Sequence, residues 1–291
     1  MTLFLKIVYI IRFFYNLPLR IILFIGNLYS ELTRLIDRRS HDSFWEEILQ
    51  KRVNNRISKS IKISENQKIK FYIPNKISSF RVKTFFSKEP DTLEWIRKSG
   101  GNEKILYDIG ANMGIYSIYY AKMFKSEVYA FEPSLKNLDL LVKNINLNLL
   151  KNQVYVIPNP LSKKFIFSNL FQVKSGPGLA GTTFNDNFVK KRMATVYKDS
   201  PLNHVECTTL GLSIDSLKDL NLIKKPDLLK IDVDGNELDI IEGCKDTIKE
   251  SKKISILIET SKDTESGIKK IFETLGLVKK SQRRNNEIWE K

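Results

Sequence analysis

Two consecutive strand, turn and helix units constrain the fold of this chain more than any other feature. The segment KILYDIGANMGIYSIYYAKMF, from Lys104, gives an apolar run, a glycine turn and a helical pattern. The segment EVYAFEPSLKNLDLLVKNINLN, from Glu127, repeats that order, and LLKIDVDGNELDIIEG, residues 228–243, shows it again. Such alternation predicts a parallel sheet covered by helices on both faces. We therefore expect an α/β fold of the Rossmann-like type, with a doubly wound, mostly parallel sheet.

The acidic residues after the third of these strands resemble a calcium loop at first sight. Asp232, Asp234 and Glu237 surround a glycine, as in an EF-hand. With that glycine at the sixth loop position, however, Lys230 and Ile241 occupy ligand positions, which neither side chain can serve. Because these acids follow a strand that turns into a helix, they indicate a ligand site at the carboxyl end of the sheet.

The turn after the first strand discriminates between two nucleotide cofactors. The dinucleotide fingerprint requires G-x-G-x-x-G, but counting from Gly110 the other two places hold Asn112 and Ile115. The S-adenosylmethionine pattern, acid-x-Gly-x-Gly-x-Gly, finds Asp108, Gly110 and Gly114 in register, with Asn112 at the middle glycine. Asparagine tolerates a left-handed backbone. The turn therefore favours S-adenosylmethionine over NAD.

The end of the second strand supports the same cofactor. Glu132 lies 24 residues after Asp108, where an acceptor for ribose hydroxyls is expected. We expect Asp108 to face the ammonium group of adenosylmethionine, in part through water. The absent side chains at Gly110 and Gly114 would let the backbone approach the amino-acid and ribose portions closely.

Three ordered motifs resemble those of the FkbM family of methyltransferases. YDIGANMGIYS, AFEPSLKNLDLLVKNINLN and LLKIDVDGNELDIIEGC are similar to D-x-G-A-N-x-G, to F-E-P with N-x-x-x-N, and to K-I-D-x-E-G-x-E. The resemblance spans about residues 104–260. It implies a class I methyltransferase fold that binds S-adenosylmethionine and methylates a hydroxyl oxygen of a sugar, a lipid-linked glycan or a secondary metabolite.

The resemblance also assigns residues by position. It implies that Glu132 holds the ribose and that the cofactor turn is lined by Asp108, Gly110, Asn112 and Gly114. The motif beside the transfer site is then formed by Asp232, Gly235 and Glu237. One departure is that Asp234 stands where the family has glutamate, so its carboxylate is shorter by one methylene.

Transfer to a hydroxyl requires a base, for which three acids are candidates. Asp232 comes first, and Glu237 and Glu259, in ISILIET, are the others. The alternative is that these acids have only structural roles. Asp232 would then cap the following helix, and Glu237 would pair with Lys230 or accept hydrogen bonds from backbone donors. Glu259 would simply be exposed at a strand end. We predict no resident metal; a divalent cation on Asp232, Asp234 and Glu237 is the competing hypothesis.

The segment SGPGLAGTTFNDN, residues 175–187, interrupts the sheet pattern and predicts a loop that closes over a site. Thr182 and Thr183 in this segment, together with Asp234, are the predicted substrate contacts. A solvated loop is the alternative.

Residues 1–40 form the most apolar part of the chain. Lys6, Arg12 and Arg20 interrupt it before a transmembrane span accumulates. Placed on a helical wheel, its polar residues gather on one basic face, which predicts an amphipathic helical arm. Such an arm suits an anionic membrane surface, or it packs on the domain or on a second subunit.

The remaining chain divides into two predicted parts. Residues 41–84 are transitional α/β sequence, with a helix near residues 43–52 and short strands within Lys68–Tyr72 and Ser79–Phe85. Residues 85–291 are the predicted FkbM-like methyltransferase domain.

Composition limits the partners and the compartment. The formal charge of +15 favours anionic partners, but no clustered basic stripe with aromatics appears, so we do not expect nucleic acid. Cys207 and Cys244 form no disulfide framework, which predicts a cytoplasmic protein, peripheral on the inner membrane face if the arm binds there. The expected partner is a glycan or small-molecule hydroxyl acceptor. A nucleic-acid methyltransferase, an NAD-dependent enzyme and a non-catalytic scaffold of the same fold are the alternatives.

Overall fold

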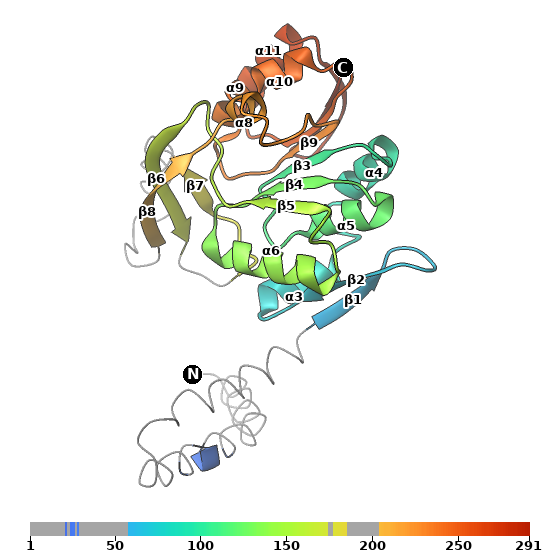
Figure 1. The fold of residues 1–291 in the computed structure, drawn as a ribbon, viewed down its shortest axis with the longest axis vertical. Coiled ribbons are helices and arrows are strands. Elements are labelled where there is room, and N and C mark those ends of the chain that lie inside the picture. Colours follow the sequence, from blue (N-terminus) through green and yellow to red (C-terminus); the bar gives the residue numbers. More distant parts are fainter. Residues whose placement is uncertain (1–20, 22–23, 27, 29–57, 174–176, 185–203) are drawn as a thin grey trace, which may run out of the picture. The chain divides into compact units, whose positions relative to one another are not determined.

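The computed structural model describes residues 21, 24–26, 28, 58–173, 177–184 and 204–291 (Figure 1). The chain forms two compact units, residues 1–57 and 58–291. In the first unit the described residues Ile21, Phe24, Ile25 and Leu28 are helical and exposed. The rest of the predicted arm, and the helix predicted near residues 43–52, lie outside the described residues. No helix in the described ranges is long and apolar enough to cross a membrane.

The core of the second unit is a seven-stranded sheet. Its order is β11 (Val278–Arg283), β12 (Asn286–Glu290), β10 (Ser255–Glu259), β9 (Leu228–Ile231), β3 (Leu106–Ile109), β4 (Val128–Phe131) and β5 (Val154–Ile157). The strands from β10 to β5 are mutually parallel, and β12 runs antiparallel to both β10 and β11. The chain moves outward in one direction from β3 and returns to its other side at β9, so a topological switch point lies between these two strands. The predicted doubly wound, mostly parallel sheet is confirmed.

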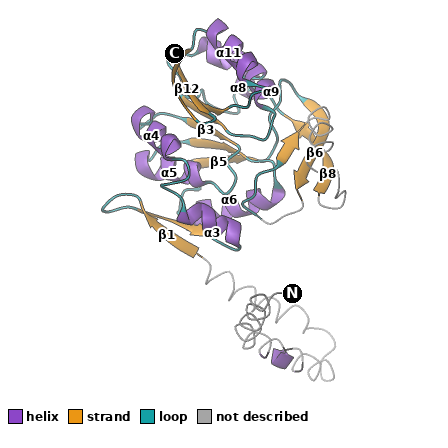
Figure 2. Cartoon of the chain, turned by 180° about the vertical axis from the view of Figure 1, so that it is seen from behind, coloured by secondary structure: helices purple, strands orange, loops and turns teal. Residues whose placement is uncertain are grey.

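Helices cover both faces of this sheet (Figures 1 and 2). α4 (Pro90–Ser99), α5 (Ile115–Phe124) and α6 (Leu135–Leu147) pack in one apolar cluster. α8 (Ile214–Asp219), α9 (Glu237–Glu242), α10 (Lys245–Glu250) and α11 (Glu265–Thr274) pack in the other. Alternate strand residues enter different clusters: Leu106 faces the first and Tyr107 the second. The near-continuous apolar strands of the sequence follow from this two-sided burial.

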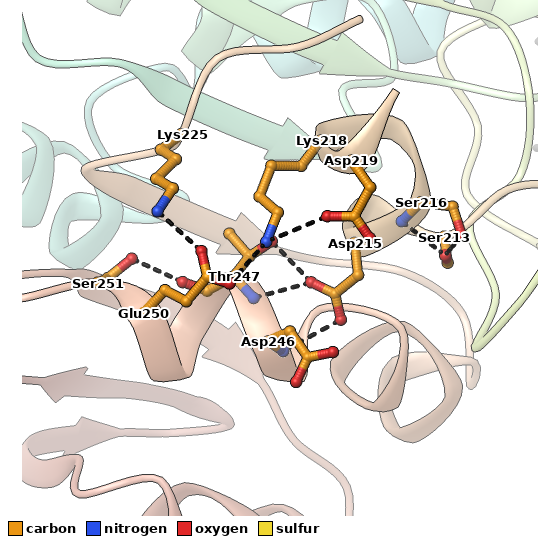
Figure 3. Close-up of polar contacts among 10 residues, drawn as sticks. All are labelled: Ser213, Asp215, Ser216, Lys218, Asp219, Lys225, Asp246, Thr247, Glu250 and Ser251. Atoms are coloured by element: carbon orange, nitrogen blue, oxygen red, sulfur yellow. Dashed lines mark hydrogen bonds and ion pairs between the residues drawn. The ribbon is translucent and has the colours of Figure 1, made fainter. Parts of the chain in front are cut away.

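The second face is tied together by a polar junction between α8 and α10 (Figure 3). Asp215 Oδ1 accepts hydrogen bonds from the backbone amide of Thr247 at 2.8 Å and from its hydroxyl at 2.6 Å. Lys218 pairs with Glu250 at 3.1 Å. These contacts fix the two short helices to each other. None of the residues named here lines the cavity that is described below.

A hairpin and a helix precede the sheet. β1 (Ser58–Lys62) and β2 (Lys68–Tyr72) are antiparallel, and α3 (Lys76–Lys83) follows them. Asn144 of α6 and Asn148, which caps the end of that helix, accept hydrogen bonds from the backbone of β2. The strand predicted within Lys68–Tyr72 is confirmed, and the strand predicted within Ser79–Phe85 is wrong. Asn75 and Ser78 form a capping box that starts a helix through most of that segment.

A three-stranded antiparallel sheet flanks the core, in the order β7 (Thr182–Phe184), β6 (Ile166–Val173), β8 (His204–Gly211). The loop predicted around Thr182 and Thr183 is therefore wrong at this point, because both residues lie in β7. Pairing with β6 brings Phe184 opposite Leu170, and both side chains are buried. That burial outweighs the glycine-rich composition of the residues before the strand.

Candidate active site

A cavity of about 210 Å³ lies at the carboxyl ends of β3, β4, β9 and β10, beside the switch point of the sheet. Its wall includes the glycine turn after β3, Glu132 after β4, and Asp232 to Asp234 after β9. The wall also includes Thr84, Phe85, Lys88 and Glu89, between α3 and α4, and Leu179, Ala180 and Thr182. Parallel α/β sheets bind ligands at such a place.

The glycine turn follows the predicted geometry. Gly110 has φ +80°, and a Cβ there would meet the carbonyl oxygen of Asp232 at 2.0 Å, so only glycine fits. Asn112 adopts the left-handed conformation, with φ +53°, that the sequence pattern requires. Gly114 also has a positive φ, but a Cβ there would meet Leu141 Cδ1 at 2.5 Å. The missing side chain at Gly114 thus accommodates α6, and Gly114 is absent from the cavity wall.

The carboxylate of Glu132 is held by two turns. Its Oε2 accepts from the backbone amide of Asn112 at 2.7 Å, and its Oε1 accepts from that of Ser134 at 2.9 Å. Burial raises the pKa of Glu132 to about 7, against the hydrogen bonds that lower it. Glu132 lines the cavity where the sequence places the ribose acceptor.

Asp108 lies behind the cavity wall. Its side chain is fully buried and accepts a hydrogen bond from the Ser117 hydroxyl at 2.6 Å. Its other oxygen accepts no hydrogen bond and lies 3.5 Å from Lys230 Nζ. Asp108 and Lys230 stand opposite each other in the β3–β9 register. Lys230 therefore separates the predicted ammonium partner from direct contact with the cavity, which Lys230 itself lines.

Lys230 is the central cation of the site. Its Nζ lies 3.0 Å from Asp232 Oδ2 and 5.1 Å from the ring centroid of Tyr116. Burial alone would lower the pKa of Lys230, but the carboxylates of Asp232, Asp108 and Glu89 raise it. The lysine is thus charged although it is buried. A signal for this role is visible in the sequence, since a single cation within the apolar strand LLKI requires buried partners.

Two residues that the sequence left unassigned join this network. The Tyr116 hydroxyl donates to Glu89 Oε2 at 2.7 Å, and Lys88 pairs with Glu89 Oε1 at 2.9 Å. Burial raises the pKa of Tyr116, and the adjacent Glu89 adds to that effect. Burial and Asp232 act to raise the pKa of Glu89, but Lys230, Lys88 and Tyr116 outweigh them and lower it. Glu89 is therefore a fixed negative charge on the wall.

A carboxyl pair lies at the ends of β9 and β10. The side chains of Asp232 and Glu259 are joined by a hydrogen bond, and both line the cavity. Burial, together with Asp232, raises the pKa of Glu259 to about 7. Burial acts to raise the pKa of Asp232 as well, but Lys230 and Glu259 lower it. The proton of the pair consequently belongs to Glu259.

The other predicted site residues lie around this centre. Glu237 is buried in the first turn of α9, accepts from the Gly235 amide at 3.1 Å and does not line the cavity. Asp234 accepts from the Gly181 amide, and its carbonyl accepts from the Thr183 hydroxyl. Thr182 lines the cavity, whereas Thr183 is buried outside it.

The acids after β9 diverge in this arrangement. Within the described ranges, no group of three or more His, Cys, Asp or Glu side chains is placed to hold a metal ion. Asp232 turns to Lys230 and Glu259, Asp234 to the segment before β7, and Glu237 to its own turn.

Comparisons with known proteins identify relatives of this chain. Two curated proteins are similar to the chain. The hexuronic acid methyltransferase AglP of Haloferax volcanii is 22% identical over 64% of this chain and 68% of its own length. The methyltransferase sdnD of Sordaria araneosa is 24% identical over 58% of this chain and 70% of its own.

A crystal structure of methyltransferase FkbM from Methylobacillus flagellatus is also similar. It is 16% identical, with a TM-score of 0.43, and the match covers 65% of this chain and 44% of that chain. The methyltransferase FkbM domain profile matches residues 108–285, more than half of the chain and all three motifs. The chain therefore belongs to the FkbM family of methyltransferases.

Proposed function

We propose that this methyltransferase moves the methyl group of S-adenosylmethionine to a hydroxyl oxygen of a glycan, a lipid-linked saccharide or another small molecule. The observation that carries the proposal is the hydrogen-bonded pair of Asp232 and Glu259 on the cavity wall, beside the glycine turn. Such a pair can take a proton from a hydroxyl, which this transfer requires.

The cavity suits S-adenosylmethionine in its charge and in its donors. Carboxyl groups on the wall, from Glu89, Glu132, Asp232, Asp234 and Glu259, outnumber the cations Arg81, Lys88 and Lys230. Of these carboxyl groups, Glu89 and Asp232 have lowered pKa values and stay negative, which suits a ligand with a sulfonium and an ammonium group. Each oxygen of Glu132 accepts one backbone hydrogen bond and retains capacity for a ribose hydroxyl. When bound, S-adenosylmethionine would supply an electrophilic methyl group.

Residues of this chain would then position the acceptor and take its proton. Asp232, paired with Lys230, stays charged and can accept a hydrogen bond from the acceptor hydroxyl. Ionised Glu259 is the stronger base, because its pKa is about 7 and general bases work best near the operating pH. We therefore assign the proton to a Glu259 oxygen and the orientation of the hydroxyl to Asp232.

One relative, the hexuronic acid methyltransferase AglP, supports the sugar among these acceptor classes. A sugar acceptor suits a polar wall that offers Thr182 and several carboxylates. We further propose that the reaction takes place in the cytoplasm, with residues 1–40 holding the protein at the inner membrane face.

Labelled-methyl transfer tests the function. The full chain is incubated with S-adenosylmethionine labelled in its methyl group and with an extracted glycan fraction, or with RNA or DNA. We expect label in the glycan fraction only. Label in nucleic acid would overturn the acceptor proposal. No label in any fraction, together with no thermal stabilisation by adenosylhomocysteine, would favour a non-catalytic scaffold, and stabilisation by NAD instead would favour an NAD enzyme.

Variants separate the two carboxyl groups. We expect Glu259→Gln to bind adenosylhomocysteine as the wild type does and to lose the increase of the rate through about pH 7. Asp232→Asn should keep adenosylhomocysteine binding and lose transfer. If Glu259→Gln retains the wild-type rate and pH profile, the base is not Glu259.

A further inference from the structure

The segment from Ser58 to Lys88, whose last part reaches the cavity wall, is strongly basic. It contains eight Lys and Arg residues and a single acid, Glu65. Seven of the eight are lysines, and all seven are exposed: Lys59, Lys62, Lys68, Lys70, Lys76, Lys83 and Lys88. Lys62 and Lys68 stand directly opposite each other in the hairpin, an arrangement of like charges that destabilises a sheet. Such a charge distribution indicates an anionic partner.

Exposed aromatic rings accompany this charge, so the expectation that no basic stripe with aromatics occurs is wrong for this segment. Lys76, Phe80 and Lys83 follow one another at i, i+4 and i+7 in α3, so they lie along one side of the helix. Phe80 is 56% exposed, and Phe86, just after the helix, is 51% exposed. We call Lys76, Phe80, Lys83, Phe86 and Lys88 the basic-aromatic face.

The lysines of this face have few partners. Among the described residues, Lys88 pairs with Glu89, whereas Lys76 and Lys83 form no ion pair. The four hairpin lysines, on the strands beside α3 in both views (Figures 1 and 2), form none either. Their charge is therefore available to a partner that brings many negative groups on one surface.

We propose that the basic-aromatic face binds the headgroup region of anionic lipids. Lysines attract an anionic membrane surface, and exposed phenylalanine rings insert at the boundary of headgroups and acyl chains. A single-stranded nucleic acid would need a groove beside the rings, but neither Phe80 nor Phe86 lines the cavity. The face therefore fits a broad, flat surface of negative charge better than a strand.

The same segment connects the membrane to the active site. Arg81 of α3, and Thr84, Phe85 and Lys88 after it, line the cavity. Arg81 Nε also donates to the carbonyl of Gly178 at 2.6 Å, which fixes α3 to the segment before β7. A face docked on lipid would hold the mouth of the cavity next to the headgroups. This inference goes beyond the methyl transfer proposed above and does not depend on which acceptor is used.

Vesicle binding of the full chain tests the proposal. The probes are phosphatidylcholine vesicles with and without phosphatidylglycerol. The charge variant is Lys76→Gln with Lys83→Gln, and the aromatic variant is Phe80→Ser with Phe86→Ser. Matched controls change exposed residues elsewhere: Lys252→Gln with Lys253→Gln, and Leu220→Ser with Leu222→Ser.

We expect the charge variant to bind phosphatidylglycerol vesicles on the order of tenfold more weakly, and the controls to bind as the wild type does. The aromatic variant should also bind more weakly. Equal losses in the charge variant and its control would overturn the proposal, because they would report net charge alone. Unchanged binding of both face variants would overturn it too, as would a loss of salt-sensitive RNA binding with vesicle binding intact.

A direct measurement locates the face at the membrane. Phe80→Trp should add fluorescence that brominated phosphatidylglycerol quenches beyond the wild-type signal, whereas Leu222→Trp should add none. An unquenched tryptophan at position 80 would refute insertion even if the lysine variants weaken binding.

Discussion

Lys230 Nζ lies 3.0 Å from Asp232 Oδ2, and the two side chains emerge from the same strand end. Lys230 is 1% exposed, whereas the Asp232 side chain is 34% exposed, so the pair joins the interior of the sheet to the cavity wall. The lysine also supplies the counter-charge for Asp108. One cation therefore pairs with two carboxylates, one structural and one facing the ligand.

Lys230→Met tests this arrangement. The variant leaves Asp108 buried without a cation, and breaking a buried pair in this way costs about 3–5 kcal/mol of unfolding free energy. Urea unfolding should show the loss. Lys225→Met, which removes an exposed lysine paired with Glu250, should cost no more than about 1 kcal/mol. Adding Asp108→Asn to Lys230→Met should restore part of the stability, and a double variant that is weaker still would contradict the pairing.

The buried Glu237 makes the stability depend on pH. Burial raises the pKa of Glu237 to about 7 from its ordinary value of 4.5, so the folded state holds this proton more tightly than the unfolded state. Stability from Glu237 is present below about pH 4.5 and is lost as the pH rises to about 7. Glu237→Gln should flatten this decrease in unfolding measurements, and the exposed Glu242→Gln should not. Glu132 and Glu259 act in the same window, so some slope remains.

Alanine substitutions at the two glycines of the turn should have different effects, one on stability and the other on ligand binding. Gly114→Ala brings a methyl group against Leu141 in a left-handed backbone, and should cost about 1–3 kcal/mol of stability without changing adenosylhomocysteine affinity. Gly110→Ala meets backbone of Asp232 rather than a side-chain end, so we expect it to lose adenosylhomocysteine binding. Calorimetric titration distinguishes them. A Gly114→Ala protein of normal stability and weakened affinity would reverse our assignment.

Substitutions of the two adjacent threonines of β7 should have different effects on stability and on the acceptor KM. Thr183→Val removes the hydroxyl that donates to the Asp234 carbonyl at 3.1 Å, and should cost about 1 kcal/mol of stability with the acceptor KM unchanged. Thr182→Val alters the cavity wall, so we expect a higher acceptor KM with stability unchanged. Steady-state kinetics and thermal unfolding of both variants provide the comparison; identical effects would mean that strand alternation does not divide their roles.

The sequence was sufficient where the physics is local. The positive φ of Gly110 and the left-handed Asn112 follow from steric rules that act within a few residues. The parallel sheet followed from repeated strand and helix units. The strand predicted at Ser79–Phe85 failed because the cap formed by Asn75 and Ser78 begins a helix, which outweighs the local alternation.

The rest of the site depends on contacts between distant segments. Glu89 precedes α4, Tyr116 lies in α5 and Lys230 in β9, and they meet because the sheet places β3 beside β9. No local pattern reports such a meeting. Only the isolated lysine among aliphatic residues signalled that a buried partner exists, and it did not say which.

Asn112 acts as a joint between the two walls of the cavity. Its backbone amide holds Glu132, while its side chain donates to the Leu179 carbonyl at 3.0 Å, which also accepts from Asn137. A glycine would supply the same φ without that bond. Because the turn and the segment before β7 are linked, we expect them to open as one unit. A first ligand that ordered this unit would spare the second the same loss of conformational entropy, so we expect the two reactants to bind cooperatively.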